Sequence, residues 1–429
     1  MSVTTRAFTA AAALLLSTPA FSQAIDPAVQ KRIDRILRRT PVIDGHNDVP
    51  EQVRENWNMS VEGLASGSDK RQPHPMMTDM ERLHKGGVGG QFWSVYIDAG
   101  VHGDEAIRQT LEQIDIVTRM VKAYPNDLEL ASSADDFERI HRKGRIASVM
   151  GVEGGHQMGG SMAALRQFYR LGARYMTLTH FATNEWADSA TDDPKYGGLS
   201  PFGTEVVKEM NRIGMLVDLA HVSPDTMKDA IEASKAPVIF SHSNARALED
   251  HPRNVPDDVL ALLPANGGVV MVNFYTGYLS EPFRQWNATR AGEEARLKSL
   301  FTGQPDKRKA AMDTWDAANP PPKAGIGIIA DHIEHIVKIA GHDHVGLGGD
   351  LDGIPYDQSP PGMNSVSGYP LLFAELIRRG WSDTNLGKLA GGNILRVLRR
   401  AEQVSASMKE VPPSLATLLP PAPAPKSDE

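Results

Sequence analysis

The chain has 429 residues and a formal net charge of −8, with 41% hydrophobic and 23% charged residues, the balance of a globular protein with ample material for a core. The acidic balance argues against a nucleic-acid partner, because surfaces that bind phosphates are basic. Cysteine is absent, which excludes disulfides, thiolate metal sites and cysteine nucleophiles. A metal ion would therefore be held by His, Asp and Glu, and 14 histidines are available.

The first residues have the order of a secretory signal. Arg6 precedes an apolar stretch over residues 7–16, and Pro19 and small residues follow before Ala24. The stretch is short for a membrane span, which takes about 20 apolar residues. We therefore interpret residues 1–24 as a cleaved signal peptide. The sequence predicts an exported protein, periplasmic or secreted, that is soluble after cleavage and has no membrane anchor.

Short apolar and β-branched runs then alternate with amphipathic segments of helical length. This alternation predicts parallel strands, and eight strand–helix units predict a closed (β/α)8 barrel of the TIM type. An open doubly wound sheet is the alternative, but no glycine-rich loop of the G-x-G-x-x-G type follows the first run. The predicted strands are residues 41–48, 89–97, 145–155, 175–180, 215–221, 237–242, 268–274 and 344–350.

Six of these eight runs finish in an ionisable residue. In a barrel the carboxyl ends of all strands open on one face, so side chains from different strands converge there. A single histidine at the end of a strand is usually structural, but the recurrence of the pattern favours a shared site. The residues are His46 with Asp48, Glu153, His180, His221, His242 and Asp350.

Five of these residues form a predicted metal site. His46 and Asp48 are two apart along a strand, so both side chains point to the same side. With Glu153, His221 and His242 they supply three nitrogens and two carboxylates, a set suited to Zn²⁺. Five ligands are too many for one tetrahedral zinc with an open position. We therefore predict a binuclear zinc site with a bridging carboxylate and a bridging hydroxide.

A second group of histidines is interpreted differently. His332, His335, His342 and His344 lie close together, but they do not form an H-E-x-x-H motif. Their helix would belong to the outer ring of the barrel, away from the active face. We therefore expect surface or capping residues rather than metal ligands.

Two further segments are set apart by composition. The stretch from Tyr275 to Gly325 is rich in charge and longer than expected, and it is either a lid or subunit contact or a tolerated surface insertion. Residues 406–429 are rich in Pro and Ala and are predicted to be a disordered tail. The catalytic domain is accordingly predicted over residues 25–405.

Ordered motifs along the chain resemble the membrane dipeptidase (renal dipeptidase) family of zinc metallopeptidases. VIDGHND, GGQFWSVY, GVEGGH, YMTLTH, LVDLAHVS, PVIFSHSNAR, RNVPDDVL and GGDLDG match in order from about Pro41 to about Leu398. The resemblance implies a (β/α)8 barrel with a binuclear zinc site that cleaves dipeptides, and some members also open β-lactam rings. The chain departs from the animal members in lacking their cysteines and their lipid-anchor signal.

The resemblance also implies a role for each metal ligand. His46 and Asp48 would bind one zinc ion, and His221 and His242 would bind the second. Glu153 would bridge the two ions.

Three other residues receive roles from the resemblance alone. His180 would contact the substrate carbonyl and its tetrahedral intermediate. Arg253 would clamp the terminal carboxylate of the substrate, and Asp350 would transfer the proton.

The prediction is thus a zinc-dependent dipeptidase in which a hydroxide that bridges the metals attacks the peptide carbonyl. One alternative is a related barrel amidohydrolase acting on N-acyl amino acids, cyclic amides or lactones, which would not need the Arg253 clamp. Another is a periplasmic solute-binding protein without turnover, which would not need all five ligands. Small dipeptides are the expected partners. The sequence is also compatible with a homodimer and does not decide the oligomeric state.

Overall fold

The computed structural model of the protein describes residues 25–418 and is built around a closed barrel of parallel strands. Successive strands pair around the ring, β9 pairs with β1, and β2 pairs with β4. All eight predicted strands are present, so the predicted (β/α)8 barrel is confirmed. The barrel strands are β1 (Val42–Asn47), β2 (Val88–Tyr96), β4 (Ile146–Glu153), β5 (Ala173–Thr177), β6 (Leu216–Asp218), β7 (Ile239–Phe240), β8 (Val269–Val272) and β9 (Val345–Leu347).

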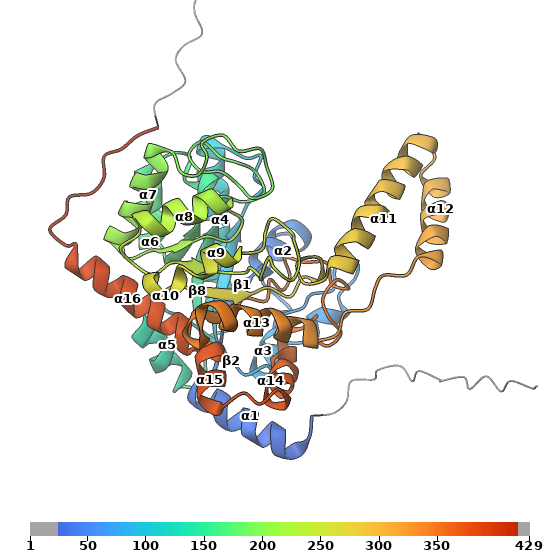
Figure 1. The fold of residues 1–429 in the computed structure, drawn as a ribbon, viewed down its shortest axis with the longest axis horizontal. Coiled ribbons are helices and arrows are strands. Elements are labelled where there is room, and N and C mark those ends of the chain that lie inside the picture. The colour runs from blue at the N-terminus through green and yellow to red at the C-terminus, as the bar shows by residue number, and fades with distance from the viewer. Residues whose placement is uncertain (1–24, 419–429) are drawn as a thin grey trace, which may run out of the picture.

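Helices surround this barrel on the outside (Figure 1). Helices α7 and α8 both begin with a Ser-Pro pair, in which the serine side chain accepts a hydrogen bond from a backbone amide of the first turn. The helices outside the 275–325 stretch are α1 (Pro27–Arg39), α2 (Val49–Asn56), α3 (Met80–Lys85), α4 (Gly103–Ala123), α5 (Ala134–His141), α6 (Met162–Arg170), α7 (Pro201–Ile213), α8 (Pro224–Ala233), α9 (Asp257–Leu260), α10 (Leu263–Asn266), α13 (Gly327–Ala340), α14 (Tyr369–Arg378), α15 (Asp383–Gly387) and α16 (Asn393–Ser407).

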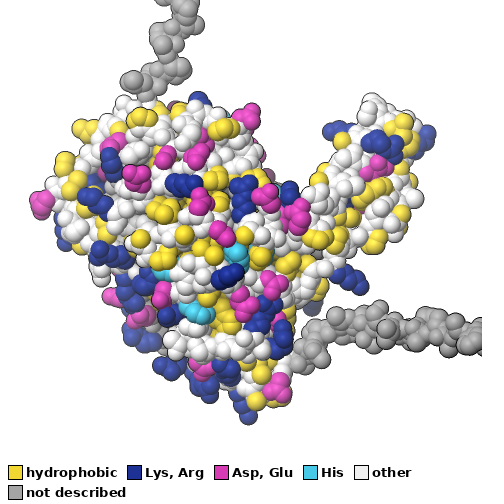
Figure 2. Space-filling view, viewed as in Figure 1, with side chains coloured by type: hydrophobic (Ala, Val, Ile, Leu, Met, Phe, Trp, Pro, Cys, Tyr) yellow, Lys and Arg dark blue, Asp and Glu magenta, His cyan; other side chains and the backbone are white. Residues whose placement is uncertain are grey.

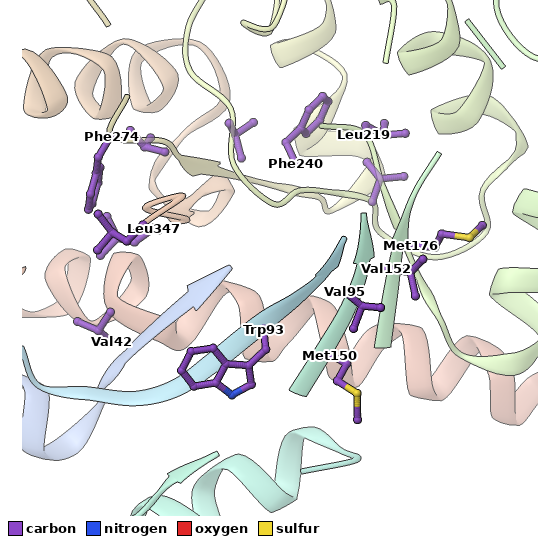
Figure 3. Packing of buried hydrophobic residues seen from close by; sticks show 14 of the residues in the cluster. Val42, Trp93, Val95, Met150, Val152, Met176, Leu219, Phe240, Phe274 and Leu347 are labelled. Carbon is purple, nitrogen blue, oxygen red and sulfur yellow. The ribbon is translucent and has the colours of Figure 1, made fainter. Parts of the chain in front are cut away.

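Alternate residues of the strands pack into two different cores. In β4, Val149 belongs to a cluster inside the barrel, whereas Met150 and Val152 belong to the layer between strands and helices. Figure 3 shows part of that outer layer, where Trp93 and Phe240 are also packed. The inner cluster includes residues of α16. Hydrophobic side chains therefore fill the barrel at the end near α16, and the other end, where the strands have their carboxyl termini, is left for polar side chains.

Several strands end earlier than the sequence predicts. Strand β6 ends at Asp218, so His221 lies three residues beyond it, and Asp350 likewise follows the end of β9. Both residues have left-handed backbone conformations, with φ of 69° and 57°, which a strand does not accommodate. The predicted site residues at these positions are therefore carried on the loops that leave the strands.

The short strand β3 (Leu128–Leu130) was not among the predicted strands. It pairs with the first three residues of β4, next to the ring rather than within it. Three residues are too few for an alternating pattern to stand out in the sequence.

The charge-rich stretch forms a helical hairpin, α11 (Glu281–Leu300) and α12 (Pro305–Ala318), that projects away from the barrel (Figure 1). An ion pair of 2.8 Å between Arg290 and Asp316 links the two helices. Apolar and charged side chains are mixed over the hairpin surface (Figure 2). Few of its side chains are buried, so the hairpin adds little to the main core.

At the ends of the chain, the predicted signal peptide (residues 1–24) and residues 419–429 lie outside the described residues. The segment predicted as a tail starts within α16 and continues through a turn at residues 408–410 and then without regular secondary structure to residue 418. There the Ser414 amide donates to the Glu209 carboxylate at 3.2 Å, and Arg166 donates to the Ser414 carbonyl at 3.1 Å. Over residues 25–418, no helix combines the length and apolar composition that crossing a membrane requires.

Candidate metal centre and active site

A pocket of about 280 Å³ lies at the mouth of the barrel. The predicted site residues lie around it, since seven of the eight line the pocket and His46 is fully buried beside them. The structure therefore brings together side chains that come from six different strand ends. The pocket is lined by Asp48, Glu51, Tyr96, Glu153, His180, Phe181, His221, His242, Arg253, Tyr275, Tyr278, Asp350, Gly353, Ile354 and Pro355.

The two carboxylate oxygens of Glu153 face two different groups of ligand atoms. On one side, His46 Nε2 lies 3.3 Å from Glu153 Oε2 and 3.3 Å from Asp48 Oδ2. On the other side, His221 Nε2 and His242 Nε2 lie 3.1 Å and 3.4 Å from Glu153 Oε1. Glu153 thus stands between an imidazole–carboxylate pair and a pair of imidazoles.

Two further side chains lie within reach of these groups. His180 Nε2 is 3.7 Å from Glu153 Oε1, and Asp350 has a carboxylate oxygen within 4.8 Å of ligand atoms of His46 and Asp48. The geometry therefore gathers seven potential metal-binding side chains, of which the sequence predicts five as ligands and two as catalytic groups.

Two of the predicted ligands, His242 and Glu153, have the protonation that suits a bound cation. Burial and then the nearby charges of His46 and Arg253 hold the pKa of His242 well below its ordinary value, so its imidazole stays neutral. Burial opposes ionisation of Glu153, but the adjacent imidazoles of His46 and His180 hold its pKa well below the usual range. Among the described residues, His46 Nε2 and both Asp48 oxygens are buried without a hydrogen-bond partner. Buried, unpartnered acceptors of this kind fit a bound metal ion.

His46 is oriented by a tyrosine from the opposite side of the barrel. Its Nδ1 lies 2.8 Å from the Tyr175 hydroxyl, which also donates to the Gly45 carbonyl at 3.2 Å. With the hydroxyl proton directed to Gly45, Nδ1–H donates to Tyr175 and Nε2 is left as a metal acceptor. Space for the ring comes from Gly151, where a Cβ atom would lie 1.9 Å from the tyrosine. A side chain at position 151 would displace Tyr175.

His242 is oriented by a chain of hydrogen bonds from Asp218. The Ser241 hydroxyl donates to Asp218 Oδ2 at 2.6 Å and lies 2.8 Å from His242 Nδ1. Because the serine proton goes to the carboxylate, the serine oxygen accepts from His242 Nδ1–H. The imidazole therefore presents an unprotonated Nε2 to the pocket.

The same aspartate also explains why β6 and β7 end where they do. Asp218 Oδ1 accepts from the backbone amides of Ala220 and Ser241 at 3.1 and 2.8 Å. Asp44 makes similar contacts from within β1, where its Oδ1 accepts from the amide of His46 in the same strand and from the amide of Gly349 just beyond β9. These carboxylates replace strand hydrogen bonds with side-chain caps and turn the chain into the site-bearing loops.

Arg253 is a buried cation at the side of the pocket. Its guanidinium donates to the His242 carbonyl at 3.2 Å and to the Ser243 hydroxyl at 3.4 Å, and it lies 5.4 Å from the Tyr278 ring centre. Within residues 25–418 its Nε has no hydrogen-bond partner. The arginine therefore retains donor capacity for an anionic ligand.

His332 supports the loop that carries Arg253. Its Nδ1 accepts from the Ala245 amide at 3.1 Å, so its Nε2–H donates to the Leu279 carbonyl, also at 3.1 Å. His332 is fully buried, so the expected surface position is wrong for this residue, but it does cap backbone groups and belongs to none of the candidate metal-ligand groups of the described residues. The buried imidazole satisfies two backbone groups of loops that have no ladder partner.

His180 and Asp350 have the electrostatic properties of a neutral donor and a proton acceptor. Burial lowers the pKa of His180 to about 4, so the ring is neutral at neutral pH. Burial, assisted by the charges of Asp48 and Glu153, raises the pKa of Asp350 well above its ordinary value. Asn273 Nδ2 donates to Asp350 Oδ2 at 2.7 Å and fixes the orientation of the carboxylate.

The sequence did not predict Tyr175, Ser241 or Asn273, each of which contacts a site residue, or Asp218, which acts on His242 through Ser241. One signal was present for Asp218, because an aspartate inside an apolar strand needs a buried partner. Tyr175 carried no such signal, since a tyrosine in a strand is usually a core residue.

The comparisons with known proteins agree with this fold and site. A family model described as membrane dipeptidase (peptidase family M19) matches residues 30–412. An uncharacterized dipeptidase of Schizosaccharomyces pombe is 40% identical over 402 residues, which cover 89% of this chain and 86% of the relative. Dipeptidase verJ of Clonostachys rogersoniana is 41% identical over 387 residues, which cover 88% of each chain.

A solved structure supports the same assignment. The crystal structure of the probable dipeptidase PvdM from Pseudomonas aeruginosa superposes with a TM-score of 0.73 at 27% identity, covering 88% of this chain and 99% of that chain. The family predicted from the motifs is therefore confirmed. Since the family model matches most of its length, the chain belongs to the membrane dipeptidase family M19 of metallopeptidases and is a peptide-bond hydrolase.

Proposed function

We propose that this protein is a zinc-dependent dipeptidase whose two metal ions are bridged by Glu153. The placement of the two Glu153 oxygens, each facing its own group of ligand atoms, is the observation that carries the proposal. The dipeptidase names of the relatives support dipeptides as the substrate class.

The proposed ligands divide between the two sides of Glu153. His46 and Asp48 hold one zinc ion, and His221 and His242 hold the other. Zinc bound there would polarise the scissile carbonyl and lower the pKa of a water molecule to about 7, so that hydroxide is available at neutral pH. The chain itself supplies imidazoles whose tautomers are set by Tyr175 and Ser241.

Two other side chains act on the reacting groups in this proposal. His180 is neutral and has an N–H to donate to the carbonyl oxygen as negative charge develops on it. Asp350 accepts the proton of the attacking water and passes it to the leaving amine. Its raised pKa suits both halves of this transfer, because the protonated carboxyl persists long enough to act as an acid.

Arg253 restricts the length of the substrate. A dipeptide that places its scissile carbonyl at the metal ligands has its terminal carboxylate one residue beyond that bond. The buried guanidinium offers that carboxylate a charge-assisted, bidentate hydrogen bond. A longer peptide would bring an uncharged amide to the same place.

Replacement of this arginine tests the proposal. Arg253→Ala should lower kcat/KM for dipeptides by a factor on the order of 30 to 1,000, because losing one partner of a buried charged pair costs about 2–5 kcal/mol. The zinc content should not change, since arginine is not a ligand. C-terminally amidated dipeptides should already be poor substrates of the wild type and should be little affected by the mutation.

The outcome that contradicts the clamp is also clear. If the wild type cleaves the amide and the free acid equally well, Arg253 does not bind a carboxylate. The activity would then be that of a general barrel amidohydrolase acting on N-acyl amino acids, cyclic amides or lactones.

We also propose that the protein is exported and that residues 1–24 are removed. The described fold supports a cut after Ala24, because α1 begins at Pro27 and Asp26 caps its first turn. The mature chain would then begin at or near Ile25 with the first helix whole.

A further inference from the structure

One acidic side chain of the pocket has no part in the proposed mechanism. Glu51 lies in the first turn of α2, three residues after Asp48, and its half-buried side chain lines the pocket. It belongs to none of the groups of ligand atoms that lie within 4.8 Å of one another. Glu51 is therefore positioned to face a bound substrate rather than a metal ion.

Within the described chain, the side chain of Glu51 forms neither a hydrogen bond nor an ion pair. The nearest basic residue of its helix, Arg54, is engaged with Glu55 at 3.6 Å and Glu112 at 3.5 Å. Burial, and then the charges of Asp48 and Glu153, raise the pKa of Glu51 to about 9. No Lys or Arg side chain of the described residues pairs with Glu51, so its carboxylate is left to meet a cationic group of a ligand in the pocket.

The pocket is electrically asymmetric in a way that matches a dipeptide. Arg253 stands with Tyr278, and its charge suits the terminal carboxylate. Glu51 lies among the carboxylates of Asp48 and Asp350. A dipeptide carries its ammonium group on the other side of the scissile bond from its carboxylate, and two extended residues span only about 7 Å. Glu51 and Arg253 line the same pocket of about 280 Å³, so both charged groups face the space that a bound dipeptide would fill.

We propose that Glu51 binds the free α-ammonium group of the first residue of the substrate. The inference rests on the proposed dipeptidase function and adds a second selective contact to it. Arg253 recognises the carboxyl end and Glu51 recognises the amino end. The enzyme then rejects N-acylated dipeptides as well as longer peptides, because an acylated nitrogen leaves the carboxylate buried without a cation.

The test compares Glu51→Gln with a matched control on the same helix. Gln preserves the shape of the side chain and removes its charge. Glu55→Gln removes an exposed carboxylate one turn further along α2, where it does not line the pocket. The probes are L-Ala-L-Ala and N-acetyl-L-Ala-L-Ala, assayed for hydrolysis and, by calorimetry on the metal-loaded proteins, for binding.

We expect Glu51→Gln to lower kcat/KM for L-Ala-L-Ala about 10- to 100-fold, mainly through KM. The low activity toward the N-acetyl dipeptide should change by less than about twofold, and Glu55→Gln should match the wild type on both probes. Metal content should be equal in all three proteins.

Three results would overturn the inference. Equal losses on both probes would show that Glu51 acts through the metal centre or the fold. Equal turnover of both probes by the wild type would show that the amino group is not recognised. A much larger loss on L-Lys-L-Ala than on L-Ala-L-Ala would assign Glu51 to a basic side chain instead. If the wild type cleaves neither probe, the dipeptidase proposal fails, and the calorimetric comparison of the two ligands still decides whether Glu51 binds the ammonium group.

Discussion

The barrel mouth and the α11–α12 hairpin use charged residues in opposite ways. At the mouth, His46 and Asp48 from the end of β1 are buried and converge with Glu153 from the end of β4. On the hairpin, charges pair with nearby opposite charges, within one helix as Arg296 does with Glu293 and Lys309 with Asp313, or between the two helices as Arg290 does with Asp316. Such exposed pairs contribute about 0.3–0.5 kcal/mol each. The charge density of a segment therefore says little about function unless the charges are buried and unpaired.

The two regions meet at the base of the hairpin. Arg284, in the first turn of α11, forms an ion pair of 2.6 Å with Glu249. Asn254, which follows Arg253 in the sequence, donates to the Tyr278 carbonyl at 2.9 Å. The base of the hairpin thus supports the loop that carries Arg253, while the distal part of the hairpin does not contact it. Sensitivity to mutation should fall from the mouth, through the groups that orient its ligands, to the hairpin tip.

The largest effect is expected at Glu153. Glu153→Gln removes the carboxylate that, among the described residues, faces both groups of ligand atoms, and an amide is a weak metal ligand. We expect metal content to fall from two equivalents to one or fewer and kcat/KM for dipeptides to fall at least about 1,000-fold. Metal analysis and steady-state assays check this, with the exposed Glu185→Gln as control. Two bound metal ions with near-normal activity in the variant would contradict the bridging role.

An intermediate effect is expected at Asp218, which touches no metal ligand directly. Asp218→Asn keeps the size of the side chain, but an amide has only one acceptor oxygen. It cannot accept both from the hydroxyls of Thr177 and Ser241 and from the backbone amides of Ala220 and Ser241, as the two carboxylate oxygens do. The serine proton can then turn toward His242 Nδ1, which favours the tautomer that cannot bind metal through Nε2. We expect metal affinity to fall about 10- to 100-fold, the usual effect of losing a group that orients a ligand.

A titration against a competing chelator measures this affinity. Ser241→Ala should weaken metal binding in the same direction, because it interrupts the same hydrogen-bond chain. Thermal unfolding of the metal-free proteins is the control, since Asp218 also caps strand ends. Unchanged affinity in both variants would mean that His242 is oriented by packing alone.

A strand or a site residue could be predicted from the sequence when the residues that reveal it lie close together along the chain. The eight barrel strands were predictable because each strand is an apolar run. The convergence of His46, Glu153 and His242 followed from barrel topology, which places all strand ends on one face. Glu51 and Tyr175 were not predictable, because their importance depends on partners distant in sequence. Tyr175, for example, contacts a histidine 129 positions away.

The hairpin shows the converse. Its charge and length marked the 275–325 stretch in the sequence, but those properties fit a lid, a subunit contact and a surface insertion equally well. The structure narrows the choice by geometry, since the residues of this stretch that line the pocket, Tyr275 and Tyr278, precede α11. In this conformation α11 and α12 do not cover the substrate site.

The smallest effect is therefore expected when the distal hairpin is shortened. Residues 293–312 can be replaced by a short Gly/Ser loop, which removes Leu297 and Met312 together and keeps the Arg290–Asp316 pair at the new tip. The Arg284–Glu249 contact at the base is also retained. Because the removed residues neither line the pocket nor belong to the barrel interior, kcat/KM for dipeptides should stay within about twofold of the wild type. A loss of tenfold or more would show that the tip reaches the substrate site and acts as a lid.

Sedimentation of the two proteins checks the other alternative, since a fall in assembly mass on shortening would make the tip a subunit contact. An unchanged mass together with unchanged kinetics would show that the distal hairpin serves neither catalysis nor assembly. The functional part of the hairpin would then be limited to the first turn of α11, where the last contact with the Arg253 loop is made.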